Sequence, residues 1–365
     1  MANAHITRDV FGTLPDGRAV ERIALHGAGG FEARIITFGA ALQALIAPDR
    51  GGVCDDVVLG HDNLDGYVDK RQFFGASVGR YANRIAHGRF VLDGETVQLN
   101  TNDGPHALHG GPDGFDRKLW QILDIDEGGQ PAVTLRYVSP TGEENYPGRL
   151  DVRLTYRLTG PTELSISFDA RTDRPTIVNL TNHSFFNLEG LSAMTDILGH
   201  ELTIDADAFL AIDDTAIPLP EPPRAVDGTP FDFRSATAIG ARIRADERQL
   251  RGSLGYDHNY CLRGGQGVRL AARVVAPRSG RVLELSTDQP GLQFYSGNYL
   301  NGSSSGKGRL YRQSDAFCLE PQVWPDTPNR PDFPSARLAP EEVYRHHSVY
   351  RFSTSGAAAT QGAAA

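Results

Sequence analysis

Apolar and polar residues alternate along much of the chain. The clearest run covers residues 150–158, where apolar and polar side chains occupy opposite faces without a break. Residues 164–168 repeat the pattern after a Gly160-Pro161-Thr162 turn, and residues 132–138 alternate as well. A period of two is typical of antiparallel strands with one buried face. The pattern therefore predicts a protein rich in antiparallel sheet.

Short turn signals separate the strand-like runs. Asp93-Gly94 lies between two apolar segments and predicts a tight hairpin. Arg278-Ser279-Gly280-Arg281 separates the strand-like residues 268–274 from residues 282–285. Only residues 237–250 have a pattern that predicts a modest helix. The arrangement predicts an all-β protein of many strands packed as a sandwich.

Composition bears on the number of domains. The 365 residues are 40% hydrophobic, which supplies a large core, and 40 glycines and 22 prolines fit many turns. The Pro-rich residues 217–230 have strand-like text on both sides, so we interpret them as a long surface loop. We predict one domain over residues 1–354 and a disordered Ala- and Gly-rich tail over residues 355–365.

Charge and cysteine content exclude several classes of protein. A formal net charge of −9 argues against a duplex nucleic-acid binder, and the chain lacks an apolar run long enough for a membrane helix. The N-terminus has no signal-peptide pattern. Cys54, Cys261 and Cys318 have neither zinc-site spacing nor the density of a disulfide scaffold. We predict a cytoplasmic protein without nucleic-acid or membrane partners, monomeric, with a dimer as the alternative.

Two glycine-rich segments resemble nucleotide-binding loops and fail as such. His26-Gly27-Ala28-Gly29-Gly30 is followed by Glu32 where a dinucleotide loop needs its third glycine, and by a strand-like segment. Residues 302–308 are one residue short of a phosphate loop and have glycine where the magnesium-binding hydroxyl belongs. Both segments are predicted to be flexible loops.

The histidines give no convincing metal site. His106 and His109 are three residues apart, but glycine and proline flank them and argue against the helix that would align them. A third ligand cannot be identified from spacing. We therefore predict no metal. His346-His347 is expected to be exposed and without a role.

Polar, aromatic and glycine residues concentrate in six segments. Amide, charged and imidazole groups satisfy the hydroxyls of a sugar, and aromatic faces cover its C–H patches. For any one segment, buried turn-forming and capping residues are an equally good interpretation. Six together favour a carbohydrate pocket. The segments are residues 79–85, 108–111, 178–188, 256–260, 292–298 and 318–326.

In order and approximate spacing, these segments resemble the aldose 1-epimerase family, the galactose mutarotases. The resemblance covers the chain from about Phe11 to about Phe352, and the opening residues 11–17 are also typical. It implies a large antiparallel β-sandwich of the galactose mutarotase-like supersandwich type, with few short helices. It also implies an isomerase of hexose and galactose metabolism that interconverts the α and β anomers of a free aldose. The only partner implied is a monosaccharide substrate, and no cofactor is needed.

The resemblance assigns roles to seven residues, and the sequence departs from the family at none of them. Glu320 matches the general base and His183 the general acid. Ring opening needs a base for the C1 hydroxyl proton and an acid for the ring oxygen. From ordinary pKa values of ~4.3 and ~6.5, we expect Glu320 ionised and His183 held protonated, which a nearby carboxylate favours and burial opposes. The sugar-binding positions are Asn83, Arg84, His109, Asp257 and Gln293.

Each residue also has a structural alternative. Glu320 could be a buried ion-pair partner, His183 a core histidine and Asp257 a turn cap. Arg84 could belong to a structural ion pair, with Arg80 or Arg89 as the more exposed neighbour. Gln293 could be an ordinary strand amide.

Three other functions stay open. A hexose-6-phosphate epimerase of the same superfamily would need additional basic groups for the phosphate. A glycoside hydrolase could use Asp257 and Glu320 as its two carboxylates. A non-catalytic carbohydrate-binding protein would have no need of the His183 and Glu320 pair. The sequence does not rank galactose, glucose, xylose and arabinose as substrates.

Overall fold

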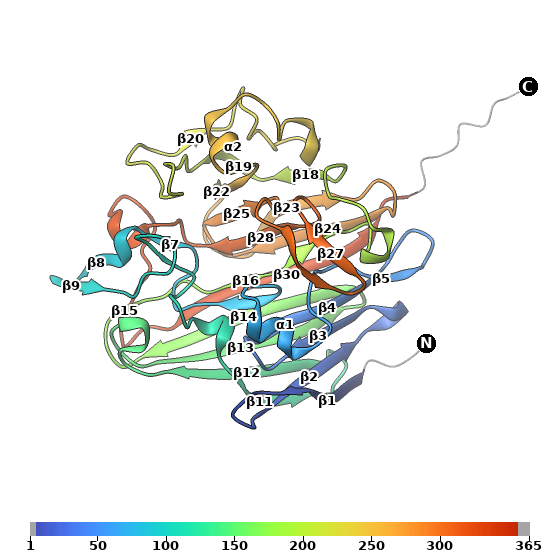
Figure 1. Cartoon of the computed structure of the whole chain (residues 1–365), viewed down its shortest axis with the longest axis horizontal. Coiled ribbons are helices and arrows are strands. Elements are labelled where there is room, and N and C mark those ends of the chain that lie inside the picture. Colours follow the sequence, from blue (N-terminus) through green and yellow to red (C-terminus); the bar gives the residue numbers. More distant parts are fainter. Residues whose placement is uncertain (1–4, 357–365) are drawn as a thin grey trace, which may run out of the picture.

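The largest unit of the fold is a nine-stranded antiparallel sheet (Figure 1). The structure is a computed structural model that describes residues 5–356. The sheet runs from β11 at the bottom of Figure 1 to β18 near the top, in the order β11-β12-β13-β14-β30-β24-β23-β18-β21. Its strands are β11 (Gln121–Asp126), β12 (Ala132–Ser139), β13 (Leu150–Gly160), β14 (Glu163–Thr172), β30 (Tyr344–Thr354), β24 (Arg281–Thr287), β23 (Arg269–Val275), β18 (Glu201–Ile204) and β21 (Thr237–Ala238).

A six-stranded sheet in the order β17-β28-β25-β22-β19-β20 packs with it. Leu154 and Phe168 from the large sheet belong to the same buried cluster as Phe294 and Leu319 from the smaller one. The predicted all-β sandwich is therefore confirmed. The strands are β17 (Phe185–Phe186), β28 (Phe317–Gln322), β25 (Gly291–Tyr295), β22 (Asp257–Leu262), β19 (Ala206–Phe209) and β20 (Arg224–Ala225).

The N-terminal part forms a third sheet from five consecutive strands. Ile23 and Ile35 from this sheet join the same core cluster. Its strands are β1 (His5–Thr13), β2 (Ala19–His26), β3 (Glu32–Ile36), β4 (Ala41–Pro48) and β5 (Cys54–Asp56). Two-stranded pairs complete the fold: β6 (Ala76–Val78) with β16 (Thr181–His183), β7 (Arg84–Ile85) with β10 (Ala107–Leu108), β8 (Arg89–Leu92) with β9 (Glu95–Gln98), β15 (Thr176–Ile177) with β29 (Arg337–Leu338), and β26 (Asn301–Gly306) with β27 (Arg309–Arg312).

The alternating runs correspond to β12, β13 and β14, as predicted. The Asp93-Gly94 hairpin is also confirmed, between β8 and β9. Both turn residues have positive φ, 50° and 89°, as a two-residue turn of this kind requires. The predicted tail lies outside the described residues from position 357 onward. None of the helices in the described part of the chain is long and apolar enough to cross a membrane.

The predicted helix over residues 237–250 is wrong. This segment pairs as β21 with β18, forms one short 3-10 helix at Ile239–Ala241, continues through turns, and becomes α-helical only at α2 (Arg248–Gly252). Ile239 and Ile243 are both buried in the core, although no helix connects them. These two buried isoleucines are four positions apart in the sequence, which is the spacing expected on one face of a helix. The only other α-helix in the described residues is α1 (Leu64–Asp69).

Two further expectations are corrected. Residues 302–308 form the β26–β27 hairpin rather than a flexible loop. Lys307 at its turn pairs with Asp56 at 2.6 Å and donates to the carbonyl of Gln43 at 2.6 Å. His346 is buried, not exposed: its Nδ1 bonds to the carbonyl of Leu180 at 2.8 Å and its Nε2 to Ser348 Oγ at 2.8 Å.

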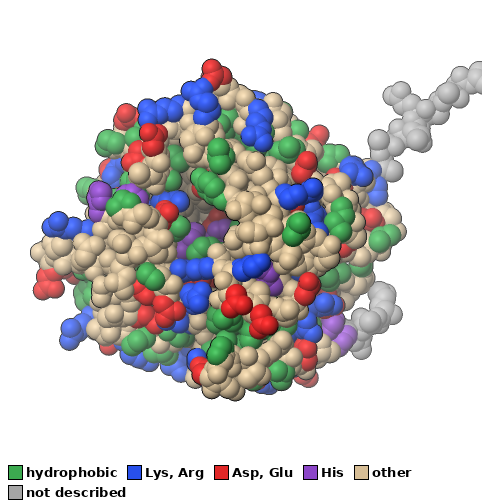
Figure 2. All heavy atoms as spheres, viewed as in Figure 1, with side chains coloured by type: hydrophobic (Ala, Val, Ile, Leu, Met, Phe, Trp, Pro, Cys, Tyr) green, Lys and Arg blue, Asp and Glu red, His purple; other side chains and the backbone are tan. Residues whose placement is uncertain are grey.

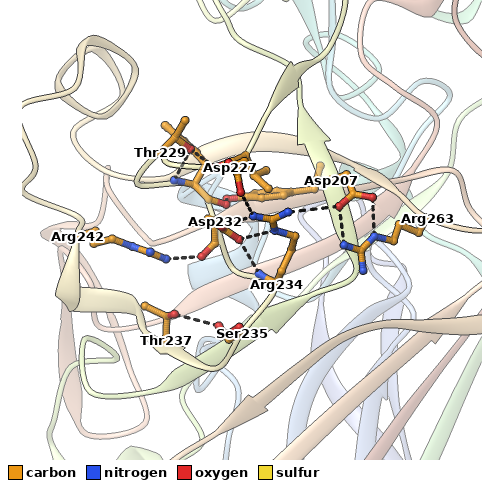
Figure 3. Close-up of polar contacts among 12 residues, drawn as sticks. Asp207, Asp227, Thr229, Asp232, Arg234, Ser235, Thr237, Arg242 and Arg263 are labelled. Carbon is orange, nitrogen blue, oxygen red and sulfur yellow. Dashed lines mark hydrogen bonds and ion pairs between the residues drawn. The ribbon is translucent and has the colours of Figure 1, made fainter.

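An ion-pair network anchors the segment between β20 and α2 to the six-stranded sheet (Figure 3). Arg234 pairs with Asp227 at 2.5 Å and with Asp232 at 2.6 Å, and it lies 3.8 Å from Asp207 on β19. Arg263, which follows β22, pairs with the same Asp207 at 2.5 Å. Because Asp207 is shared, the long irregular segment is connected to two strands of the sheet.

Four buried histidines make the fold sensitive to acid. Burial lowers the pKa of His183 and His346 to about 4, and that of His200 and His258 to about 3. In the unfolded chain each would titrate near ~6.5. The unfolded state therefore binds more protons at acidic pH.

We expect the contribution of these histidines to the free energy of unfolding to be constant above pH ~6.5 and to fall steeply as pH drops toward 4. Each pH unit between the two pKa values costs about 1.4 kcal/mol per histidine. Urea unfolding at pH 7, 6, 5 and 4.5 measures the loss. His258→Gln is expected to flatten the dependence, and the exposed His87→Gln is the matched control. Equal slopes for the two variants would contradict this explanation.

Candidate active site

All seven residues assigned from the resemblance line one cavity of about 190 Å³. Figure 2 shows a hollow near the middle of the molecular face, with histidine side chains visible inside it. The cavity lies where the six-stranded sheet meets the β6–β16 and β7–β10 pairs. Its lining comprises Arg71, Gln72, Phe73, Asn83, Arg84, Leu108, His109, His183, Phe185, Asp257, Gln293, Tyr295, Tyr299, Leu300 and Glu320.

Three neighbouring strands supply the carboxylates and the amide. Glu320 on β28 lies opposite Gln293 on β25, and Asp257 begins β22 on the other side of β25. Strand alternation explains the placement, because Leu319 and Phe294 point into the core while their neighbours Glu320 and Gln293 point into the cavity. Gln293 Nε2 donates to Asp257 Oδ1 at 2.7 Å, which fixes the orientation of both side chains.

His183 closes the floor of the cavity from β16. Its ring stacks between Phe73, at a centroid distance of 5.7 Å, and Phe185, at 4.9 Å. Its Nε2 lies 3.5 Å from Glu320 Oε2, and both side chains are more than nine-tenths buried. Among residues 5–356, no group forms a hydrogen bond with Glu320 Oε2, although this atom is buried.

Two loops contribute the remaining polar groups. Asn83 and His109 both have positive φ, 68° and 52°. The backbone N–H of Asn83 donates to His109 Nδ1 at 3.1 Å, so the neutral imidazole of His109 carries its proton on Nε2. Arg84 lines the cavity and pairs with Asp103 at 2.7 Å, so the ion pair considered from the sequence is present.

Burial sets the protonation of the pair differently from the expectation. It lowers the pKa of His183 to about 4 and raises the pKa of Glu320 well above its ordinary value, with the negative charge of Asp257 adding to the rise. Burial also raises the pKa of Asp257 and lowers that of His109. Burial therefore favours neutral His183 with protonated Glu320. An ionised pair with Glu320 negative and His183 positive holds the same single proton.

His109, His183 and Glu320 bring their polar atoms within 4.8 Å of one another, which is close enough for three ligands of a metal ion. The hydrogen bond at His109 Nδ1 argues against that use. It leaves the proton on Nε2, so His109 offers no lone pair to the cavity. The arrangement fits hydrogen bonding to hydroxyls better than metal coordination.

Sequence reasoning missed the aromatic and cationic wall of the cavity. The Phe73 ring contacts the rings of His183 and His109. The Arg71 guanidinium lies 4.7 Å from the centre of the Phe73 ring. Arg71 itself is held by two hydrogen bonds to Asp116, both 2.7 Å. Phe73 has a φ of 59°, and nothing in its local sequence predicts that conformation. Tyr299, which is 53% exposed at the cavity, was missed as well.

Of the two neighbours considered as the more exposed, Arg89 is exposed and Arg80 is buried. Its guanidinium donates to Ser139 Oγ at 2.7 Å and to the carbonyls of Pro140, Pro147 and Gly148 at 2.7 to 2.9 Å. These hydrogen bonds of Arg80 fix the start of the segment that carries Asn83 and Arg84.

Arg80→Met is expected to reduce the free energy of unfolding by about 3 kcal/mol, because it leaves several buried acceptors without a donor. Chemical denaturation measures this loss. Arg89→Met, on an exposed neighbour, is the control and is expected to change little. A stability loss for Arg80→Met no larger than that of the control would contradict a stabilising role for the Arg80 hydrogen bonds.

Comparisons with known proteins agree with this geometry. The sequence matches the family profile described as Aldose 1-epimerase over residues 21–351. It is 46% identical to galactose mutarotase of Bos taurus, over 95% of this chain and 98% of that protein, and 38% identical to aldose 1-epimerase of Escherichia coli, over 93% and 96%. The fold resembles the crystal structure of galactose 1-epimerase from Lactobacillus acidophilus, with a TM-score of 0.85 at 26% identity, covering 97% of this chain and all of that one. The chain therefore belongs to the aldose 1-epimerase family.

Proposed function

We propose that this protein interconverts the α and β anomers of free aldoses, with Glu320 as the base and His183 as the acid. The observation that carries the proposal is the buried pair itself. A carboxylate oxygen and an imidazole nitrogen face each other at 3.5 Å in a cavity lined with groups that suit hydroxyls. A binding protein has no need of such a pair, because a buried unpartnered carboxyl oxygen costs stability.

In the proposed reaction the two groups move one proton each. The Glu320 carboxylate takes the C1 hydroxyl proton while the C1–O5 bond breaks, and His183 gives its Nε2 proton to O5, which leaves as the C5 hydroxyl. Rotation about C1–C2 by half a turn presents the other face of the aldehyde. The same steps in reverse close the ring and restore both groups.

Burial favours the protonation state of the open-chain stage. Once the ring is open, Glu320 is protonated and His183 is neutral, which is the state that the low dielectric of the site prefers. The ionised pair needed at the start is stabilised by the sugar, whose C1 hydroxyl donates to the carboxylate. Proton transfer in the forward direction therefore removes two buried charges, and this assists ring opening.

We propose that the other five residues bind the sugar hydroxyls. His109 Nε2–H and the Asn83 and Arg84 groups donate from one wall, and Asp257 and Gln293 accept and donate from the other. Asp257→Asn is expected to raise KM about tenfold with a smaller change in kcat, because one good charged acceptor is lost. Initial rates at varied sugar concentration measure both constants. The control is Asp169→Asn, at an exposed position of β14. An unchanged KM would remove Asp257 from the binding set.

The pairing of the cavity's arginines favours a free sugar over a sugar phosphate. The cations that line the cavity are Arg71 and Arg84, and each is already paired with a carboxylate, Asp116 and Asp103. Neither is therefore available as the additional basic group that a phosphate needs.

Polarimetry with several sugars tests the proposed function. Freshly dissolved α-D-galactose, α-D-glucose and a pentose, each with and without protein, are expected to relax faster with protein and to the same final rotation. Galactose 6-phosphate and glucose 6-phosphate are expected to relax at their spontaneous rate. Acceleration of the phosphates alone would instead favour the phosphate-epimerase alternative, and no acceleration of any sugar would contradict the proposal.

We further propose a monomeric cytoplasmic protein with a single domain over residues 1–354. The largest core cluster, which takes residues from Ile23 to Phe352, supports the single domain. The three free cysteines, of which Cys54 is exposed, support a reducing compartment. Light scattering of the purified protein is expected to give a mass near 39.6 kDa.

A further inference from the structure

One strand contacts both nitrogens of the His183 ring. Cys318 precedes Glu320 by two residues on β28, so both side chains lie on the same face of the strand. Glu320 Oε2 lies 3.5 Å from Nε2, and Cys318 Sγ lies 3.6 Å from Nδ1. Cys318 is fully buried, and it does not line the cavity. The catalytic chemistry proposed above leaves this contact unused.

We propose that Cys318 is a positioning residue whose sulfur accepts a hydrogen bond from His183 Nδ1–H, so that Nε2 is the nitrogen that gains and loses the catalytic proton. This inference rests on the proposed anomer interconversion and deepens it. A neutral imidazole carries one proton, on either nitrogen. After His183 gives its Nε2 proton to the sugar, the remaining proton must stay on Nδ1 for Nε2 to recover its own in ring closure.

Sulfur suits this position because it is a weak acceptor. A carboxylate at Nδ1 would fix the same tautomer, but it would also stabilise the imidazolium and raise the pKa of His183. Burial raises the pKa of Cys318, so the group stays a neutral thiol and adds no charge. The ring is therefore held in one orientation while its proton remains easy to release. The His183 ring stacks against Phe73 and Phe185, so its remaining freedom is rotation within its own plane. The contact with Cys318 restricts this rotation.

Nitrogen NMR of the sugar-free protein tests the tautomer independently of activity. Long-range ¹H–¹⁵N spectra, with His183 assigned by its loss in His183→Gln, are expected to show Nδ1 protonated and Nε2 unprotonated in the wild type. Cys318→Ala is expected to give a mixture of both tautomers. Cys318→Ser, which keeps a hydroxyl acceptor, is expected to retain most of the wild-type pattern. Cys261→Ala, which replaces a cysteine on β22 that lies outside the cavity lining, is the matched control.

Kinetics provide the second readout. Cys318→Ala is expected to lower kcat about five- to tenfold with KM unchanged, as the loss of one weak hydrogen bond implies, and Cys318→Ser is expected to recover most of it. A wild-type spectrum with Nδ1 unprotonated would overturn the inference, as would a Cys318→Ala protein with the wild-type tautomer and kcat. If the wild type shows the predicted tautomer but no anomerase activity, the proposed function fails while the hydrogen bond stands. Thermal unfolding of each variant identifies any loss of fold.

Discussion

Glu320→Gln is expected to lower kcat by about 10³-fold or more while the protein stays folded. The amide has the same shape and fills the same buried position, but it cannot take the C1 hydroxyl proton. Stability is expected to be equal or higher, because burial disfavours the carboxylate that the substitution removes. Activity and stability thus change independently, which separates loss of the base from loss of the fold.

The matched control is Glu284→Gln, on β24 of the nine-stranded sheet. This variant is expected to keep kcat within twofold of the wild type. The binding of a non-reacting sugar analogue, followed by calorimetry, is expected to persist in Glu320→Gln. A Glu320→Gln protein with more than a tenth of the wild-type kcat would show that another group acts as the base.

His183→Gln is the second large effect, with an expected loss in kcat of about 10²- to 10⁴-fold. Glutamine can hydrogen-bond the ring oxygen but cannot transfer a proton to it. The effect on KM is expected to be small, because the ring is stacked between aromatic side chains and reaches the sugar through one nitrogen.

The pH dependence of kcat/KM provides a second test of the role of His183. As pH falls through about 4, the pKa of His183, the pair takes up a second proton and Glu320 can no longer act as a base. The wild-type kcat/KM is therefore expected to fall below this pH, within the range where the protein stays folded. The residual activity of His183→Gln is expected to lack that transition. The same acid limb in both proteins would assign it to another group.

Much of the fold could be predicted because alternation and turn chemistry are local. The strands β12, β13 and β14 and the β8–β9 hairpin follow from residue patterns alone. The segment from residue 237 to 250 could not be predicted, because Ile239 and Ile243 reach the core from an irregular path that only the surrounding sheets impose. The β26–β27 hairpin depends on Lys307 meeting Asp56, about 250 residues earlier in the chain, which no local pattern reveals.

The seven residues assigned from the resemblance all line one cavity, so the ordered motifs predicted which side chains would lie together. Their protonation could not be predicted, since it depends on burial. The expectation of an ionised Glu320 beside a protonated His183 used ordinary pKa values, and desolvation reverses both. Phe73 was missed because its contact with His183 comes from a loop whose conformation is set by Arg71 and Asp116.

Polarimetry of freshly dissolved α-D-galactose with equal amounts of wild type, Glu320→Gln and His183→Gln tests the central claim most directly. The wild type is expected to speed relaxation to the same final rotation, and both variants are expected to approach the spontaneous rate. Relaxation as fast with either variant as with the wild type would contradict the assignment of Glu320 and His183 as the proton-transferring pair.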